Sequence, residues 1–589
     1  MAPVGNLSQR YQWAMHRLQA RRAGFYNPET GFISQPEPRS IGSFAKGQQL
    51  AAGNIMLAGH LIEAPNAMLW DIDPPDLMFA QDAHGFAWLD DLAAAGDINA
   101  RRLAQDWVFG WIERYDTGRG AGWLPDLTGR RLIRWIHHAL FILQGRTSEE
   151  SERFFRALGR QTIFLSKRWS ATKHGLPRFE ALTGLIYAGL SLAGMEQHVQ
   201  PATRALAREC RSQIDEKGGI STRNPEELLE VFTLLTWSAT ALKEAGWTPA
   251  ESHQKALRRM APTLRSLRHS DGGLARFHGG GRGLDGRLDH ALLKSGNRDM
   301  NSDGLAMGFA RLSSGRTSII VDAEIPPQGR AAVNAHASTL AFEMTSGRRA
   351  VIVNCGSGDT FGEDWRSAGR ATPSHSSLYI EGQSSARLGR KLSYGGIIRE
   401  VLVEGPKQVP IEMTHGLDAI SFNGAHDGYV AKYGLTHVRE LKLSLDGREL
   451  SGEDLLIAIE ERHKKTFDRA LEAGKLEGIC TQIKLHLHPE VDANLDLGAN
   501  AVSLALKSGE VWVFRHDGVA ELSVEPSVYL ERGRLQPSAT KQVVLSRRVM
   551  EYGTRTRWSL AKAQDTALAV RDTHREEVST IGGPKEDDE

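Results

Sequence analysis

Cysteine is scarce in this chain of 589 residues, which has only Cys210, Cys355 and Cys480. An odd number of cysteines spread this far apart provides no disulfide framework and fits a reducing compartment. Long apolar runs are also missing, because no stretch of about 18 apolar residues occurs and the basic N-terminal segment lacks the apolar core of a secretory signal. We therefore expect no membrane span and a cytoplasmic location, with the periplasm or cell envelope as the alternative.

A strong charge of either sign is absent as well. The chain has 72 Lys and Arg against 71 Asp and Glu, a formal net charge of +1. This balance provides no overall field for nucleic acid or for an anionic membrane, so we expect neither as a partner. A binding partner is therefore to be sought in a local site.

The first half of the chain has helical periodicity. A chain this long exceeds one ordinary core, so two large domains are expected. Residues 1–50 read as a helix followed by an extended arm that wraps a surface. Residues 51–300, including the stretch up to Glu63, show successive amphipathic segments at 3.6-residue spacing, separated by short Gly, Pro and Asp turns. No shared repeat motif links these segments, which favours an α/α toroid over a sequence-defined solenoid.

The second half has strand periodicity. Over residues 301–571 the apolar period changes to 2, with short spacing between segments, which predicts a large antiparallel β-sandwich. The charged, apolar-poor residues 572–589 are expected to be a disordered tail. The fold class is therefore multidomain: an N-terminal α/α toroid, then a β-sandwich, with a cleft between them.

Three motifs mark the start of the strand-rich half. They are HASTLAFE from His336, VNCG with Asn354 and Cys355, and TPSHSS with His375. With the helical array before them, they resemble the heparinase II/III-like polysaccharide lyases, over roughly residues 50 to 565. The resemblance implies an α/α toroid followed by a β-super-sandwich. It also implies β-elimination on an acidic, uronate-containing polysaccharide or oligosaccharide.

The resemblance also implies a metal site. Members of this family that carry a metal hold zinc on a His, an Asp and a His, which correspond here to His336, Asn354 and His375. An amide is a poor zinc ligand, and a Cys355 thiolate would restore charge and softness, although neighbouring side chains on a strand point to opposite faces. The alternative is that the histidines are hydrogen-bonded structural residues.

The catalytic residues of related lyases are matched only in part. In register, the Asn-His pair of the relatives falls on Leu176 and Pro177, and their catalytic tyrosine falls on Glu227, whereas Glu180 matches a glutamate seen in some relatives. One hypothesis is that Arg223 and Asn224 hold the substrate carboxylate while Glu227, with a pKa raised by the pocket, acts as base.

The same segment has a structural explanation. Asn224 is a good helix N-cap, the proline after it suits the first helical position, and acids there suit the helix dipole. His336 and Tyr433 are further candidates for the acid or base, although tyrosines in sandwich strands are more often core residues. We expect a lyase. The alternatives are a carbohydrate-binding protein that has lost this chemistry and a hydrolase with paired carboxylates such as Glu180 and Glu227.

Overall fold

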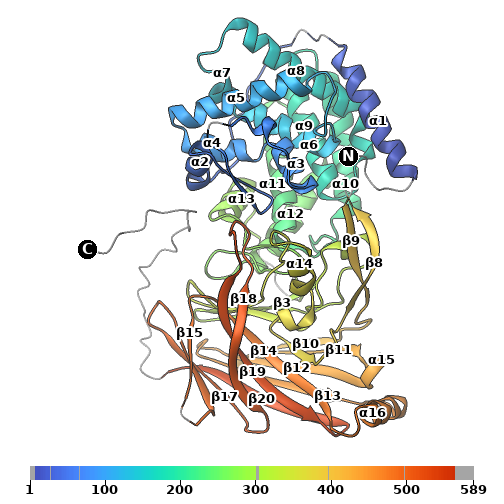
Figure 1. The fold of residues 1–589 in the computed structure, drawn as a ribbon, viewed down its shortest axis with the longest axis vertical. Helices are drawn as coiled ribbons and strands as arrows, with labels where there is room; N and C mark the ends of the chain where they lie inside the picture. The colour runs from blue at the N-terminus through green and yellow to red at the C-terminus, as the bar shows by residue number, and fades with distance from the viewer. Residues whose placement is uncertain are drawn as a thin grey trace.

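Helices make up the first half of the chain (Figure 1). The computed structural model describes residues 7–26, 28, 30–65, 67–299, 304–394, 397–496 and 498–563, so the tail predicted for residues 572–589 lies outside the described residues. The helices are α1 (Leu7–Gly24), α2 (Phe44–Ala51), α3 (Leu77–Gly85), α4 (Trp88–Ala95), α5 (Ile98–Tyr115), α6 (Pro125–His137), α7 (Ala139–Leu143), α8 (Ser148–Arg168), α9 (Leu176–Ser191), α10 (Val199–Gln213), α11 (Pro225–Glu244), α12 (Glu251–Ser266) and α13 (Arg287–Ser295).

Inner and outer helices differ in burial, as a toroid requires. Helix α9 is buried along its whole length from Phe179 to Ser191 and packs against α6, α10 and α11. Helix α10 buries only one face and exposes arginines on the other. Local signals fix where helices begin: Thr147 and Glu150 form a reciprocal capping box at α8, and Asp97 caps α5. The predicted helical toroid is confirmed.

One short segment of the first half was predicted wrongly as helix. Helix α2 ends at Ala51, and a hairpin of β1 (Asn54–Leu57) and β2 (His60–Glu63) follows it. The backbone is left-handed on both sides of β1, with φ of 89° at Gly53 and 87° at Gly59. A helix cannot continue through such positions, so the chain turns back into a hairpin.

Strands dominate the second half, in two large sheets in which neighbouring strands of the described residues pair antiparallel. One sheet has the order β10 (Ile411–His415), β11 (Ala419–Tyr429), β12 (Leu435–Ser444), β13 (Glu449–Ile457), β20 (Gly553–Lys562), β17 (Val511–His516), β16 (Ala501–Ala505), β15 (Asp492–Leu495). The other has the order β18 (Glu521–Tyr529), β19 (Ser538–Val549), β14 (Ile479–Leu487), β6 (Arg349–Val353), β5 (Phe342–Ser346), β4 (Thr317–Asp322), β3 (Phe309–Ser314), with β7 (Leu378–Ile380) also on β14. The predicted β-sandwich is confirmed.

Smaller elements decorate the sandwich. The hairpin of β8 (Arg387–Tyr394) and β9 (Ile397–Glu404), together with α14 (Glu363–Gly369), lies toward the toroid in Figure 1. Helices α15 (Val430–Tyr433) and α16 (Glu461–Ala473) lie at the opposite end of the sandwich. In the described part of the chain, no helix combines the length and apolarity needed to cross a membrane.

The two domains share packed surface. The apolar core of the toroid continues into the sandwich through Phe309, Ile320 and Ala341, while a second core fills the space between the sheets. Ion pairs cross the same junction, including one between Arg532 of the sandwich and Glu226 of α11 at 3.0 Å. The junction is therefore tightly packed near these residues, and the pocket described below lies inside the toroid.

Candidate functional site

Two glycines bring α6 and α9 into close contact at the centre of the toroid. A Cβ added at Gly184 would lie 2.5 Å from the Cα atom of Gly129, and one added at Gly129 would collide with the backbone of Glu180 and Ala181. Only glycine permits backbones to approach this closely. The approach places Arg130, the residue after Gly129, beside Glu180.

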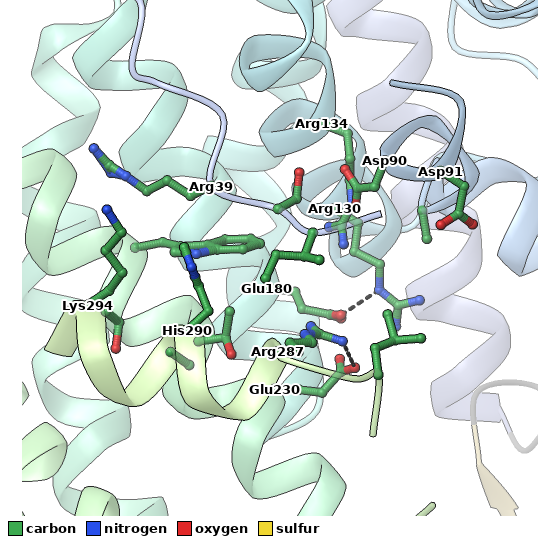
Figure 2. A pocket seen from close by; sticks show the side chains of 18 of the residues that line it. Arg39, Asp90, Asp91, Arg130, Arg134, Glu180, Glu230, Arg287, His290 and Lys294 are labelled. Carbon is green, nitrogen blue, oxygen red and sulfur yellow. Dashed lines mark hydrogen bonds and ion pairs between the residues drawn. The ribbon is translucent and has the colours of Figure 1, made fainter. Parts of the chain in front are cut away.

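Arg130 and Glu180 form an ion pair in a pocket of the toroid. Nε of Arg130 donates to Oε1 of Glu180 at 2.5 Å (Figure 2). Glu180 is 4% exposed, and its Oε2 is buried with no hydrogen-bond partner among the described residues. One oxygen of this carboxylate is therefore held, and the other is available for a proton.

The pocket has a volume of about 290 Å³ and is lined by charged side chains from several elements. Figure 2 shows a second ion pair, in which Nη1 of Arg287 on α13 lies 3.1 Å from Oε1 of Glu230 on α11. Six Lys and Arg side chains line it against four Asp and Glu side chains: Arg39, Lys46, Arg130, Arg134, Arg287 and Lys294 against Asp90, Asp91, Glu180 and Glu230. The lining therefore carries a basic excess suited to an anionic ligand.

The N-terminal arm forms one wall of this pocket, in agreement with the prediction that the arm wraps a surface. Arg39 donates through Nη2 to Glu244 at 2.6 Å, and its side chain is 10% exposed. Nη1 of Arg39 is buried and has no hydrogen-bond partner in the described part of the chain. A buried guanidinium nitrogen without a partner is costly unless a ligand supplies the acceptor.

The acids of the pocket divide into two kinds. Burial raises the pKa of Glu180 to about 7, although Arg130 opposes the shift. Burial also acts on Asp90, but Arg134 and His138 outweigh it and lower the pKa to about 2. A carboxyl group that titrates near neutral pH beside one that stays ionised is the pattern expected of a proton-transfer site.

Arg223 is not free to hold a substrate carboxylate, so this prediction is wrong. Its Nη2 pairs with Oδ1 of Asp322 at 2.6 Å and also donates to the carbonyl oxygen of Gly308, while Nε and Nη1 donate to the carbonyl oxygens of Met307 and Ile325. The side chain is 8% exposed and joins the toroid to the sandwich. Arg223 is therefore a buried link between the domains.

The helix-capping explanation of Asn224 is confirmed. Its Oδ1 accepts from the backbone N–H groups of Glu226 and Glu227 at 3.0 and 3.2 Å, so the amide oxygen is used. Glu227 is half-buried, and burial raises its pKa to about 7. It is absent from the residues that line the pocket, although Glu230, one turn later on α11, is present.

His336 and His375 do meet, but deep in the junction. Nδ1 of His375 lies 2.8 Å from the carbonyl oxygen of Ala371, which places its proton there and leaves Nε2 to accept from Nδ1 of His336 at 3.0 Å. The backbone N–H of His336 donates to Nδ1 of His278. The two rings are 2% and 1% exposed, so neither reaches a substrate in this structure.

The other two members of the expected zinc shell point elsewhere. Oδ1 of Asn354 accepts from the backbone N–H of Ser376 at 3.0 Å, and Sγ of Cys355 lies 3.5 Å from Nδ1 of His486. Among the described residues, no group of three or more His, Cys, Asp or Glu side chains is placed to hold a metal ion. The donor set does not fit zinc as arranged, because Nε2 of His375 and Oδ1 of Asn354 are used in hydrogen bonds within the protein, which leaves Nε2 of His336 as a single buried nitrogen without a partner among the described residues.

Tyr433 is placed far from these groups. It lies on α15, which packs against α16 at the end of the sandwich remote from the toroid (Figure 1), and its ring contacts Lys432. Tyr433 therefore lies apart from the other candidate residues. Its neighbour Tyr429 is a core residue whose hydroxyl group donates to the carbonyl oxygen of Leu378.

Several residues of the pocket were missed from the sequence, above all Arg130, Arg134, Glu230 and Arg287. Arg130 and Arg134 are four residues apart on α6, a spacing that puts both on one helix face and that a search for paired charges on apolar helices would have found. Arg39 carried no such signal, since the arm has no periodicity.

Comparisons with known proteins agree with this architecture. The family model described as heparinase II/III-like, C-terminal, matches residues 297–559. The chain is 30% identical over 569 residues to FtsZ-localized protein C of Caulobacter vibrioides (strain NA1000 / CB15N), an alignment that covers 93% of this chain and 92% of that protein.

Two crystal structures are similar in fold. Heparinase III has a TM-score of 0.66 at 13% identity, covering 94% of this chain and 90% of its own. A heparan sulfate lyase mutant from Pedobacter heparinus has a TM-score of 0.55 at 14% identity, covering 94% and 88%. The matched sandwich, the relative aligned over most of both chains and the shared toroid-and-sandwich fold lead to one conclusion: the chain belongs to the heparinase II/III-like family.

Proposed function

We propose that the chain binds an acidic, uronate-bearing oligosaccharide in the toroid pocket and cleaves it by β-elimination. The observation that carries the proposal is the position of Glu180, a buried carboxylate with a pKa raised to about 7 in a pocket with a basic excess. A base with a pKa near the working pH is both ionised in part and strong enough to accept a proton.

The cationic side chains have a role in this reaction. Removing the proton beside a carboxylate builds negative charge on that carboxylate, and fixed cations lower the cost of this charge. Arg130 and Arg287 hold one carboxylate each in the structure and line the same pocket. In our proposal they turn toward the substrate carboxylate, with Arg39 Nη1 as a further donor.

The bond changes balance without a cofactor. Glu180 takes the proton from the carbon next to the carboxylate, a C=C bond forms, and the C–O bond to the leaving sugar breaks. The leaving oxygen then needs one proton, which the newly protonated Glu180 or water supplies. No electron donor or acceptor is required.

A binding function without catalysis is the second candidate. Leu176 and Pro177 stand at the positions of the Asn-His pair expected from the family resemblance, and Arg223 and Asn224 are used in structural contacts. In a protein that only binds the oligosaccharide, the charged side chains of the toroid pocket would hold the ligand without removing a proton from it. A carboxylate-based hydrolase is the third candidate.

One assay separates these three functions. A lyase product carries a C=C bond conjugated to the carboxylate and absorbs in the near ultraviolet, whereas a hydrolysis product does not. A panel of uronate oligosaccharides is incubated with the protein, and absorbance, new reducing ends and binding are measured. Absorbing product supports the proposal, reducing ends without absorbance support hydrolysis, and binding alone supports the non-catalytic function.

The full-length likeness to FtsZ-localized protein C supports a proposal about location. We infer that this chain too acts at sites where FtsZ gathers, inside the cell. The measurement is the position of a fluorescent fusion relative to labelled FtsZ in dividing cells of its own host. A uniform distribution that does not change with FtsZ depletion would contradict it.

A further inference from the structure

A second hollow lies on the outer side of the toroid, away from the residues of the catalytic proposal. It has a volume of about 440 Å³ and is formed by one face of α10 and the segment before α12. Its lining includes Arg204, Arg208, Arg211 and Trp247, together with threonines and alanines. We call it the α10 groove.

The α10 groove carries uncompensated positive charge. Arg204, Arg208 and Arg211 follow at spacings of four and three residues, which puts all three on one helix face. No acidic residue lines the groove, and within the described part of the chain these arginines form no ion pair. Arg211 donates to the hydroxyl group of Ser252 at 3.2 Å. Like charges at these spacings repel one another, so the three arginines destabilise α10 unless a bound anion neutralises them.

The groove also offers a flat aromatic surface and neutral hydrogen-bonding groups. Trp247, in the segment between α11 and α12, is 41% exposed, which is high for a residue of this size. Thr203 lines the groove, and its Oγ1 is buried with no hydrogen-bond partner among the described residues. Gln200 and Thr248 add further donors and acceptors.

We propose that the α10 groove is an accessory binding surface for an acidic polysaccharide chain, distinct from the toroid pocket. The guanidinium groups of the arginines pair with the carboxylates of the polysaccharide through two parallel hydrogen bonds. The indole face of Trp247 packs on the apolar face of a sugar ring, and the threonines and Gln200 form hydrogen bonds with the sugar hydroxyl groups. An acidic peptide fits less well, because the groove has no deep apolar pocket for an anchoring side chain. The choice of ligand rests on the proposed function.

The groove lies outside the pocket, so it acts on long chains only. A polymer that is held at the groove and cleaved at the pocket gains affinity from both contacts, whereas a short oligosaccharide occupies one of them. The protein should therefore bind a long uronate polymer more tightly than a short fragment, and more so at low salt.

The test uses the full chain with three arginines of the groove replaced. The variant carries Arg204→Gln, Arg208→Gln and Arg211→Gln, and a second variant carries Trp247→Ala. The matched control removes three exposed charges from α16 through Arg462→Gln, Lys465→Gln and Arg469→Gln. Binding of a long uronate polymer, a disaccharide to tetrasaccharide set and a poly-glutamate peptide is measured by calorimetry at two salt concentrations.

We expect the groove variant to bind the polymer about tenfold or more weakly, with a smaller salt dependence, while the α16 control binds like the wild type. Turnover of short fragments should be unchanged in the groove variant. Equal polymer affinity in wild type and groove variant, or groove-dependent binding of poly-glutamate without polymer binding, would overturn the inference. Arg130→Met distinguishes the two proposals, because it should abolish turnover and leave groove binding intact.

Discussion

Nε of Arg130 lies 2.5 Å from Oε1 of Glu180, and Oε2 of the same carboxylate is buried without a hydrogen-bond partner among the described residues. This half-satisfied pair is unusual, because buried carboxylate oxygens normally find donors. It places a group with a pKa of about 7 against a pocket with a basic excess.

The contact between α6 and α9 should not tolerate a methyl group. In Gly184→Ala, the new Cβ would lie 2.5 Å from the Cα atom of Gly129, so the helices must separate. We expect the free energy of unfolding to fall by about 1 to 3 kcal/mol, although alanine itself favours a helix. Urea unfolding measures the change. Gly553→Ala, which meets no atom within 4 Å, is the control and should stay within about 0.5 kcal/mol of wild type.

The ion pair of Arg223 with Asp322 should be needed for stability. Arg223→Met leaves the fully buried Asp322 carboxylate without its cation and should cost about 3 to 5 kcal/mol. Adding Asp322→Asn should recover part of this loss, because it removes the unpaired charge. Thermal unfolding of both variants measures it. If Arg223→Met has wild-type stability but no turnover, Arg223 would instead be needed to hold the substrate carboxylate.

The stability of the wild type should depend on Glu180 over a defined pH range. The pKa of Glu180 is about 7 in the folded protein, whereas its ordinary value is 4.5. Between pH 4.5 and pH 7, the carboxyl group is therefore protonated in the folded state and ionised in the unfolded state. The stabilisation is complete below about 4.5 and is lost as the pH rises toward 7, by up to about 3 kcal/mol.

Comparison with Glu180→Gln isolates this effect, since glutamine does not titrate. As the pH rises from about 4.5 to 7, the free energy of unfolding of the wild type should fall relative to that of the variant. A difference that stays constant, or that moves in favour of the wild type, would mean that Arg130 dominates and that the carboxylate is ionised throughout.

Much of the fold could be predicted from the sequence, because periodicity reports which side of an element is buried. The change of apolar period separates the helices up to Ser295 from the strands that begin at Phe309. The hairpin at Asn54–Leu57 and His60–Glu63 was missed because it is short and lies between helical segments, where two left-handed glycines decide the path.

The candidate site was less predictable. The capping role of Asn224 can be predicted from the local sequence, because Asn followed by Pro and two acids is typical of a helix start. The role of Arg223 depends on carbonyl oxygens some 84 to 102 residues away in the chain, which no local pattern reveals. The position of Tyr433 could not be predicted for the same reason, since motif spacing does not show at which end of a sandwich a short helix such as α15 lies. Glu180 was found by resemblance, while its partner Arg130 required the contact between two helices.

The most direct test of the central claim is the rate at which near-ultraviolet-absorbing product forms from a uronate oligosaccharide. The wild type should form it, and Glu180→Gln should form it about a hundredfold or more slowly, with unchanged folding by circular dichroism. Glu227→Gln and Tyr433→Phe should retain most of the rate, because neither residue lines the pocket. Wild-type rates in Glu180→Gln, together with a loss in Glu227→Gln, would contradict the account and place the base outside the toroid pocket.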